Sequence, residues 1–391
     1  MPWEVTKVQE ERMKFITLYL DGQSKMAELC RQFNISRKTG YKYKHRYEKE
    51  GIKGLENIVR APKCHPNAIS EGIKEKLLEF KRQHPKWGAK KIRILFKREY
   101  PQLKCPAKSS IEEIFKKNGL VKARSPFKNK AAHPSQELTP ALACNDVWQI
   151  DFKGWFRTLD GKKCHNLNLI DSYSRYLLCS RGFHNTKGEG VKASLEDAFK
   201  RYGMPKVICS DNGTPFACAG FGGITQLSLW LISLGISPER IKLGKPQENG
   251  RIERLHRTIG EELLGERGKD LEEQEKKLEE FRLLYNEVRP HEGINFETPS
   301  MRYKVSQRSY ENKVEEKEME GITRRVRTSG TIKWRGQEIY VGTAAKGKWI
   351  KLQEAETGDL AVYYGKHVLA VLAKGTYERK LEEDKKKGGN V

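Results

Sequence analysis

Residues 207–213 have the sequence Val-Ile-Cys-Ser-Asp-Asn-Gly, so a short apolar run ends at the carboxylate of Asp211. The carboxyl ends of buried strands are where α/β folds gather their ligands. Asp-Asn-Gly is also a common turn sequence, so the tripeptide alone indicates little. It becomes informative only if other carboxylates of the chain converge on the same strand end.

Two further segments supply such carboxylates. Asp151 lies in the strand-like segment 148–152 (Trp-Gln-Ile-Asp-Phe), and Glu253 lies in the helix-like segment 249–254 (Asn-Gly-Arg-Ile-Glu-Arg). Mg²⁺ prefers oxygen ligands and is usually held by few protein carboxylates together with substrate phosphate. Two such ions about 4 Å apart activate the attacking oxygen and stabilise the leaving oxygen. Three carboxylates from separate elements therefore predict a two-metal site for phosphoryl transfer.

These segments resemble the Asp-Asp-Glu (DDE) core of transposases and retroviral-type integrases, and they are most similar to bacterial insertion-sequence transposases. The resemblance extends from near the N-terminus to about residue 375, and it rests on five ordered stretches: Trp148–Phe156, Asp171–Tyr176, Asp211–Phe216, Pro246–His256 and Tyr285–Pro299. It implies a DDE transposase whose catalytic residues and metal ligands are Asp151, Asp211 and Glu253, with two Mg²⁺ (or Mn²⁺) ions. Such an enzyme cleaves DNA at transposon ends and joins the freed 3′-hydroxyl to target DNA.

The catalytic glutamate has two candidates, Glu248 and Glu253, which lie 37 and 42 positions after Asp211. The family pattern places this residue three positions after a Gly that follows Asn or Gln. Gly250 and Glu253 match that pattern, so we favour Glu253.

The predicted helix around Glu253 also carries basic residues. His256 and Arg257 share a face with Glu253, which predicts a basic pair near DNA phosphates. Many relatives have a Lys two turns after the Glu, whereas this chain has Gly260 there. The phosphate contact expected from that position then falls to Arg254 or Arg257, and we predict that both bind DNA.

Charge points to a polyanionic partner. The chain has 391 residues, 75 Lys and Arg, 51 Asp and Glu, and a formal net charge of +24. Such an excess favours nucleic acid, because each neutralised phosphate releases counterions. The first 144 residues hold 32 of the basic residues against 15 acidic ones. We therefore expect double-stranded DNA as the partner, with much of the binding surface in the first third.

The chain lacks an apolar run of about 18 residues, and its first residues lack the apolar centre of a signal peptide. The 8 cysteines form no Cys-x-x-Cys pair, which favours reduced thiols. We expect a cytoplasmic, nucleoid-associated protein without a membrane span. The His-His-Cys-Cys zinc site of retroviral integrases is not apparent, which favours the bacterial branch.

The first part of the chain is predicted to be all-α. Residues 1–52 contain three helical patterns, at 8–20, 25–33 and 37–50, with Ser36 as the cap of the third. Helix, turn and basic helix indicate a helix-turn-helix domain, with Lys42 and Arg46 on one groove-facing surface. The alternative is a small bundle with a solvated basic face.

A linker at 53–69 leads to a second predicted helix-turn-helix domain at 70–122. Its basic middle includes Lys90 and Lys91, which we predict to bind DNA, and Ser109 opens a capping box for its last helix. Another linker follows at 123–144.

The rest is predicted to be α/β and then all-β. Residues 145–288 suit a ribonuclease-H-like catalytic core, with strands at 147–156, 165–171, 175–182, 206–210 and 236–243, and a helix capped by Thr186. A charged helical connection at 289–325 precedes period-two segments at 326–375, which suggest a small β-barrel. Residues 376–391 are a polar, flexible tail.

Two alternatives to the transposase stay open. One is a ribonuclease-H-type nuclease that cleaves without strand transfer, and the other is a transposase-derived, sequence-specific DNA-binding regulator. The carboxylate set argues against the regulator. Because two transposon ends must be held together, we also expect a homo-oligomer on DNA.

Overall fold

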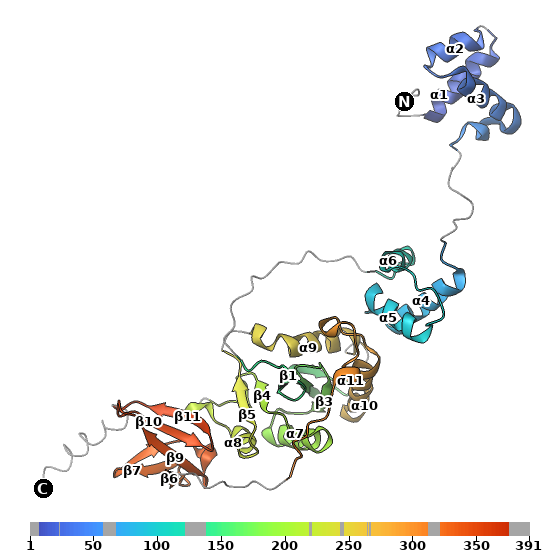
Figure 1. Cartoon of the computed structure of the whole chain (residues 1–391). Helices are drawn as coiled ribbons and strands as arrows, with labels where there is room; N and C mark the ends of the chain where they lie inside the picture. Colours follow the sequence, from blue (N-terminus) through green and yellow to red (C-terminus); the bar gives the residue numbers. More distant parts are fainter. Residues whose placement is uncertain are drawn as a thin grey trace. The chain divides into compact units, whose positions relative to one another are not determined.

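A computed structural model describes most of the chain (Figure 1). The described residues are 8–22, 24–57, 68–121, 138–218, 221–242, 246–263, 265, 267–311 and 321–374. They form two compact units, with a boundary between Ser70 and Glu71. The tail predicted at 376–391 and most of both predicted linkers lie outside the described residues.

The N-terminal unit contains the three predicted helices, α1 (Val8–Leu20), α2 (Met26–Gln32) and α3 (Arg37–Glu50), followed by a 3-10 turn (Gly51–Leu55). Ser36 caps α3 as predicted, because its side chain accepts a hydrogen bond from the backbone N–H of Thr39. Gly40 lets α3 approach α2 closely, since a Cβ there would stand 2.7 Å from the sulfur of Cys30. The helices enclose a core that includes Phe15, Leu29 and Leu55.

A second helical domain consists of α4 (Glu71–Gln83), α5 (Ala89–Glu99) and α6 (Lys108–Lys117). The buried Lys81 fixes the turn between α4 and α5, because its ammonium donates to the carbonyls of Pro85 and Trp87 at 2.7 and 2.8 Å. The capping box predicted at Ser109 is wrong. Helix α6 begins before it, at Lys108, and its N-cap residue Ala107 has no side chain that accepts a hydrogen bond.

Residues 147–240 contain a five-stranded mixed sheet in the order β3-β2-β1-β4-β5. The strands are β1 (Val147–Arg157), β2 (Lys163–Asp171), β3 (Leu177–Phe183), β4 (Val207–Ser210) and β5 (Ser237–Arg240). The first three pair antiparallel, whereas β4 pairs parallel with β1 and β5 pairs parallel with β4. This mixed sheet agrees with the predicted ribonuclease-H-like core.

Helices cover both faces of this sheet. Helices α7 (Gly188–Tyr202) and α8 (Gln226–Ser233) share one buried cluster with β1 and β2. Helices α9 (Gly250–Glu262) and α10 (Leu271–Leu283) share another with Ile170 and Leu177. The predicted cap of α7 is wrong, because the helix begins after Lys187 rather than at Thr186 and has no side-chain cap.

The predicted helical connection at 289–325 is also wrong over its described part. After a π-helical turn (Leu284–Val288), this segment contains only a 3-10 turn (Glu292–Ile294) and α11 (Pro299–Arg302). Tyr303 then stacks on Tyr176 at 4.4 Å, and Arg308 donates to the carbonyls of Leu234 and Gly235. Residues 303–308 therefore form a strap on the core, because their polar groups bond to core loops instead of to their own helix.

The C-terminal region is all-β, as predicted, and begins at residue 322. A four-stranded sheet (β11-β10-β9-β6) and the hairpin β7-β8 enclose one apolar cluster. The strands are β6 (Ile322–Arg325), β7 (Thr331–Trp334), β8 (Gln337–Tyr340), β9 (Trp349–Glu354), β10 (Leu360–Tyr364) and β11 (His367–Leu372). In the described strands these are two separate sheets, so the predicted closed barrel is not confirmed.

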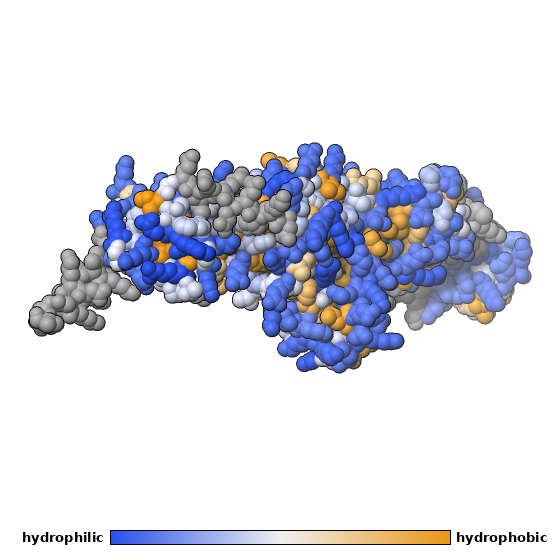
Figure 2. Space-filling model, turned by 90° about the horizontal axis from the view of Figure 1, so that it is seen from below, coloured by the Kyte–Doolittle hydropathy of each residue, from blue (hydrophilic) through white to orange (hydrophobic). Residues whose placement is uncertain are grey.

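The surface agrees with the charge-rich composition. The face drawn in Figure 2 is mostly hydrophilic, and its hydrophobic areas are small and scattered. Among the helices of the described residues, none combines the length and the apolar character that a membrane span requires.

Candidate active site

The parallel pairing of β1 and β4 brings two carboxylates to one level of the sheet. Gln149 on β1 lies opposite Cys209 on β4. Asp151 and Asp211 each follow two residues later on these strands, so the two predicted ligands face the same edge. All four residues of β4 are buried, which makes this strand a rigid support for Asp211.

The loop after β4 holds the Asp211 carboxylate in place. The backbone N–H of Gly213 donates to Asp211 Oδ1 at 3.1 Å, and Asn212 Nδ2 donates to the carbonyl of Ile241 at 2.6 Å. A Cβ at Gly213 would stand 2.9 Å from Asp211 Oδ2, closer than such atoms approach one another. Any other residue at Gly213 would therefore shift the Asp211 carboxylate, so the glycine helps to keep this carboxylate in place.

Helix α9 brings the third carboxylate. Ile252, Leu255 and Ile259 are fully buried against the sheet, which leaves Glu253 on an adjacent, exposed face. At the start of the helix, the buried Asn249 donates from Nδ2 to Asp151 Oδ2 at 3.4 Å. The other candidate, Glu248, accepts a hydrogen bond from the backbone N–H of Lys242 at 2.9 Å. The charge of Glu253 acts on Asp151, and that Glu253 rather than Glu248 is the catalytic glutamate stays a prediction.

The three carboxylates act on one another. Burial of Asp151, and after it the charge of Asp211, raises the pKa of the Asp151 carboxyl to about 7, and Glu253 adds to this effect. Within the described ranges, no three His, Cys, Asp or Glu side chains are grouped closely enough to hold a metal ion. Oxygen donors that repel one another are nevertheless the donor set that Mg²⁺ or Mn²⁺ prefers. The residues fit a divalent ion, and the exposed Glu253 side chain is free to close the set.

His256 is a site residue whose role differs from the sequence-based prediction. Its Nδ1 lies 4.0 Å from Asp151 Oδ2, and its Nε2 is buried without a hydrogen-bond partner among the described residues. Burial, followed by the charge of Lys153, lowers the pKa of His256 to about 4. The predicted basic pair of His256 and Arg257 is therefore wrong, since His256 is neutral and faces Asp151 while Arg257 is exposed. Helical spacing placed His256 beside Glu253, but it carried no information on burial.

Lys42 and Arg46, the two residues of the first domain that we predict to contact DNA, differ in how accessible their charged groups are to a partner. Lys42 is exposed, and its ammonium lies 5.6 Å from the centre of the Tyr43 ring. Arg46 is half-buried, and its Nη2 donates to the carbonyl of Glu56 at 3.0 Å. Lys42 is thus open to a partner, whereas part of the Arg46 guanidinium already binds the 3-10 segment after α3.

The predicted contacts of the second domain lie against residues that follow α9. Lys90 forms an ion pair with Glu292 at 2.5 Å. Burial, and after it the charge of Arg289, lowers the pKa of Lys91 to about 8. On α9, by contrast, Arg254 is exposed. That Lys90, Lys91, Arg254 and Arg257 bind DNA stays a prediction.

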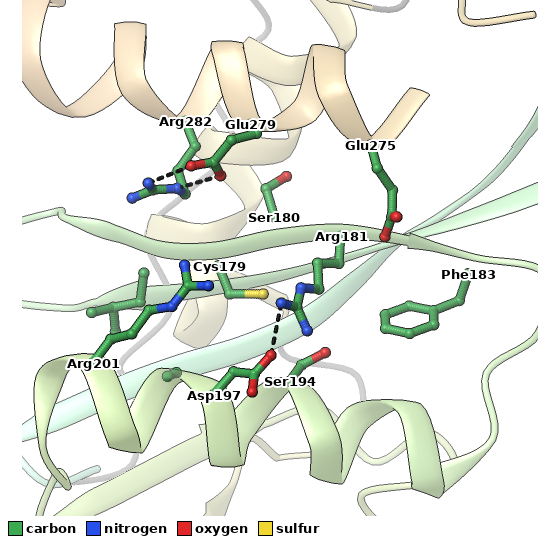
Figure 3. Close-up of a pocket in the computed structure, with 12 residues that line it drawn as sticks. Cys179, Ser180, Arg181, Phe183, Ser194, Asp197, Arg201, Glu275, Glu279 and Arg282 are labelled. Atoms are coloured by element: carbon green, nitrogen blue, oxygen red, sulfur yellow. Dashed lines mark hydrogen bonds and ion pairs between the residues drawn. The ribbon is translucent and has the colours of Figure 1, made fainter. Parts of the chain in front are cut away.

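A separate pocket of about 490 Å³ lies between β3, α7 and α10 (Figure 3). Four of its six charged side chains pair within the wall: Arg181 with Asp197 at 2.8 Å, and Arg282 with Glu279 at 2.6 Å. Burial raises the pKa of its thiol, Cys179, to about 11, so the thiol is unreactive near neutral pH. Carboxylates whose pKa values are perturbed by burial and by like charges are typical of functional sites, so the acidic edge around Asp151 is the better candidate.

Descriptions of known families match four parts of the chain. Residues 142–246 and 234–299 match two families described as integrase core domains. Residues 11–63 match a helix-turn-helix domain, and residues 39–115 match a homeodomain-like domain.

Curated relatives include proteins of bacterial insertion elements. The chain is 25% identical over 248 residues to the insertion element IS407 uncharacterized 31.7 kDa protein of Burkholderia multivorans, a match that covers 63% of this chain and 86% of the relative. It is also 25% identical over 231 residues to the IS476 uncharacterized 39.2 kDa protein of Xanthomonas euvesicatoria, covering 58% and 63%. A match to the Pol polyprotein of Radiation murine leukemia virus is 34% identical over 116 residues, but it covers 30% of this chain and 19% of the polyprotein.

Among solved structures, the magnesium complex of the HTLV-2 integrase catalytic core matches with a TM-score of 0.33 and 15% identity. The match covers 42% of this chain and all of that one (100%).

Proposed function

We propose that this chain, whose integrase core and helix-turn-helix domains mark it as a relative of bacterial insertion-sequence transposases, is an active DDE transposase. It binds the ends of its element, cleaves the DNA there and joins the 3′-hydroxyl to target DNA. The observation that supports this proposal is that Asp151 and Asp211 stand at the same level of two adjacent parallel strands, and that the charges of Asp211 and Glu253 both raise the pKa of the Asp151 carboxyl.

In this proposal, Asp151, Asp211 and Glu253 hold two divalent ions, Mg²⁺ or Mn²⁺. Ions bound there supply a nucleophile at neutral pH and offset charge on the oxygens of the phosphoryl group. The protein residues orient this site. Asn249 bonds Asp151, the backbone N–H of Gly213 holds Asp211, and neutral His256 occupies the space beside Asp151 without adding charge. Catalysis then rests on positioning and electrostatics, and no side chain acts as a covalent nucleophile.

The helical domains supply binding in this proposal. Two linked DNA-binding domains gain apparent affinity because the second binds at high effective concentration. Lys42 and Arg46 serve the first domain, Lys90 and Lys91 the second, and Arg254 and Arg257 the core. Two transposon ends have to be joined to one target, which requires a homo-oligomer on DNA.

A strand-transfer assay with oligonucleotides tests the function. The substrates carry the terminal repeats that flank the coding sequence, together with a target plasmid and Mg²⁺ or Mn²⁺. We expect nicking at the 3′ end of the repeat, followed by covalent joining to the plasmid. Cleavage without joining would indicate a nuclease, and specific binding without either reaction would indicate a regulator.

A further inference from the structure

Strand β1 contains a bulge directly after Asp151. Asp151 pairs with Asn168 and Phe152 with Leu167, but the next pair is Trp155 with His165. Two residues, Lys153 and Gly154, therefore share the position opposite a single residue of β2. Gly154 has a φ of 83°, which side chains other than glycine rarely adopt. Such bulges occur next to active sites, where they re-aim a side chain.

The re-aimed side chain is Lys153, and it points to a gap on α9. Its Nζ lies 3.4 Å from the position that a Cβ at Gly260 would occupy. Gly260 follows Glu253 by two helical turns and therefore lies on the same side of α9. Gly260 has no side chain to fill this space: a Cβ there would be in ordinary van der Waals contact with the Lys153 ammonium, whereas a longer side chain would compete with the ammonium for the space.

Lys153 is half-buried as a residue. Within the described part of the chain its side chain has no hydrogen-bond or ion-pair partner. Its positive charge contributes to the low pKa of the neighbouring His256. A cation with no partner in the protein remains available to an anion that reaches the site. Close to the carboxylates, the anion of matching chemistry is a phosphodiester, which accepts strong charge-assisted hydrogen bonds.

We propose that Lys153, aimed by the bulge into the gap at Gly260, binds a DNA phosphodiester next to the linkage that reacts and thereby positions the strand over Asp151 and Glu253. Lys153 is a positioning residue that holds the substrate strand. The inference rests on the proposed function, because it assumes that DNA lies over this edge of the core. It adds a contact from β1 to those predicted on α9.

The test measures DNA binding by the full chain in EDTA, so that it does not depend on cleavage. Duplexes of the terminal repeat carry one uncharged methylphosphonate each, at successive linkages, and fluorescence anisotropy gives each Kd. We expect one linkage near the cleavage position at which neutralisation weakens wild-type binding about tenfold. The same change should have no effect on Lys153→Gln, because the partner of that phosphate is already gone.

Three further variants complete the test. Lys162→Gln removes a charge from the exposed turn between β1 and β2 and should behave as wild type. Gly260→Leu keeps Lys153 but fills its space, so binding by this variant should no longer be weakened by the methylphosphonate at that linkage. Leucine favours helix, so α9 should stay folded. Adding Gly260→Lys to Lys153→Gln should restore the sensitivity, since it returns an ammonium to the same gap.

The proposal is overturned if every linkage affects wild type and Lys153→Gln alike. It is also overturned if inorganic phosphate at about 10 mM protects wild type but not Lys153→Gln from thermal unfolding while the duplex linkages show no difference. The site would then hold a small anion. If the wild-type chain failed to cleave but showed the linkage effect, only the proposed catalytic activity would fall.

Discussion

The N-terminal helical domain and the acidic edge of the core use charge in opposite ways. Helix α3 carries many cations, and several of them, such as Lys42 and Lys49, are exposed. The core instead sets Asp151 partly inside the protein, where burial and a neighbouring carboxylate raise its pKa to about 7. A surface of many exposed charges tolerates the loss of one. A site made of few charges in an unfavourable arrangement does not. Single substitutions should therefore have their largest effects in the core.

The carboxylates give the sharpest test of this contrast. Asp151→Asn, Asp211→Asn or Glu253→Gln should each lower cleavage and joining by about a thousandfold or more, because metal binding is worth several kcal/mol of transition-state stabilisation. Binding of terminal-repeat duplex, measured by gel shift, should change little. Glu248→Gln is the matched control, since Glu248 bonds the backbone of Lys242. Loss of activity in Glu248→Gln with retention in Glu253→Gln would reverse our assignment.

The helical domains should show the collective effect of many cations. A fragment of residues 1–125 should bind the terminal repeat specifically, and raising salt from roughly 50 to 200 mM should weaken it about a thousandfold if it contacts six or more phosphates. Titrations at several salt concentrations give the slope, with scrambled duplex as the control. Equal affinity for both duplexes at moderate salt would show that the fragment does not recognise the terminal repeat, and that residues after 125 are needed for recognition.

Within α3, a single residue should have a smaller effect. Arg46→Ala should lower the preference for the terminal repeat over scrambled duplex by about 1–3 kcal/mol, as expected for an Arg that contacts bases. Lys42→Ala should weaken both duplexes alike, as expected for a phosphate contact. Because Arg46 also bonds the carbonyl of Glu56, melting curves must show that the variant is folded. An unchanged preference would mean that Arg46 only braces the helix.

A buried histidine should make the stability of the folded chain depend on pH, whereas an exposed one should not. Burial lowers the pKa of His291 to about 3, and the ring bonds the carbonyl of Tyr285 through Nε2 at 3.0 Å. The unfolded chain binds the proton near pH 6.5, so the folded chain binds fewer protons between roughly pH 3 and 6.5. Stability from His291 is therefore present above about pH 6.5 and is lost as the pH falls towards 3.

The measurement is the melting temperature at several pH values from about 7 to 4.5. His291→Gln should reduce the acid-induced drop by a few degrees, roughly the shift that about 1 kcal/mol produces. His45→Gln, at an exposed position of α3, should leave the drop unchanged. Equal curves for wild type and His291→Gln would show that the ring is accessible to protons in the folded state.

Local signals allowed correct predictions where the determining contacts are local. Helices α1 and α3 have the predicted bounds, because apolar spacing and the Ser36 cap lie within a few residues of one another. The positions of Asp151 within a strand and of Asp211 directly after one were predictable for a similar reason, since a polar residue interrupts or follows a run suited to a buried strand.

Predictions failed where distant partners decide the structure. The segment after α11 has a helix-like composition, yet Arg308 finds its partners on Leu234 and Gly235, far away in the sequence. The neutral state of His256 depends on burial beside β1, and the bulge that aims Lys153 depends on pairing with β2. Helical or strand periodicity in the sequence does not predict these contacts.

The strap at residues 303–308 sets the smallest chain length at which the core can be expected to fold. Integrase-core similarity ends at residue 299, but Tyr303 lies face to face with Tyr176, and its hydroxyl donates to Asn145 Oδ1 at 2.9 Å. A recombinant domain that ends at residue 299 would expose the Tyr176 ring to solvent. The loop carbonyls that accept hydrogen bonds from Arg308 would then lose this partner. A domain that continues to residue 311 retains the strap. For crystallisation or isotope labelling, the domain border therefore belongs beyond the strap.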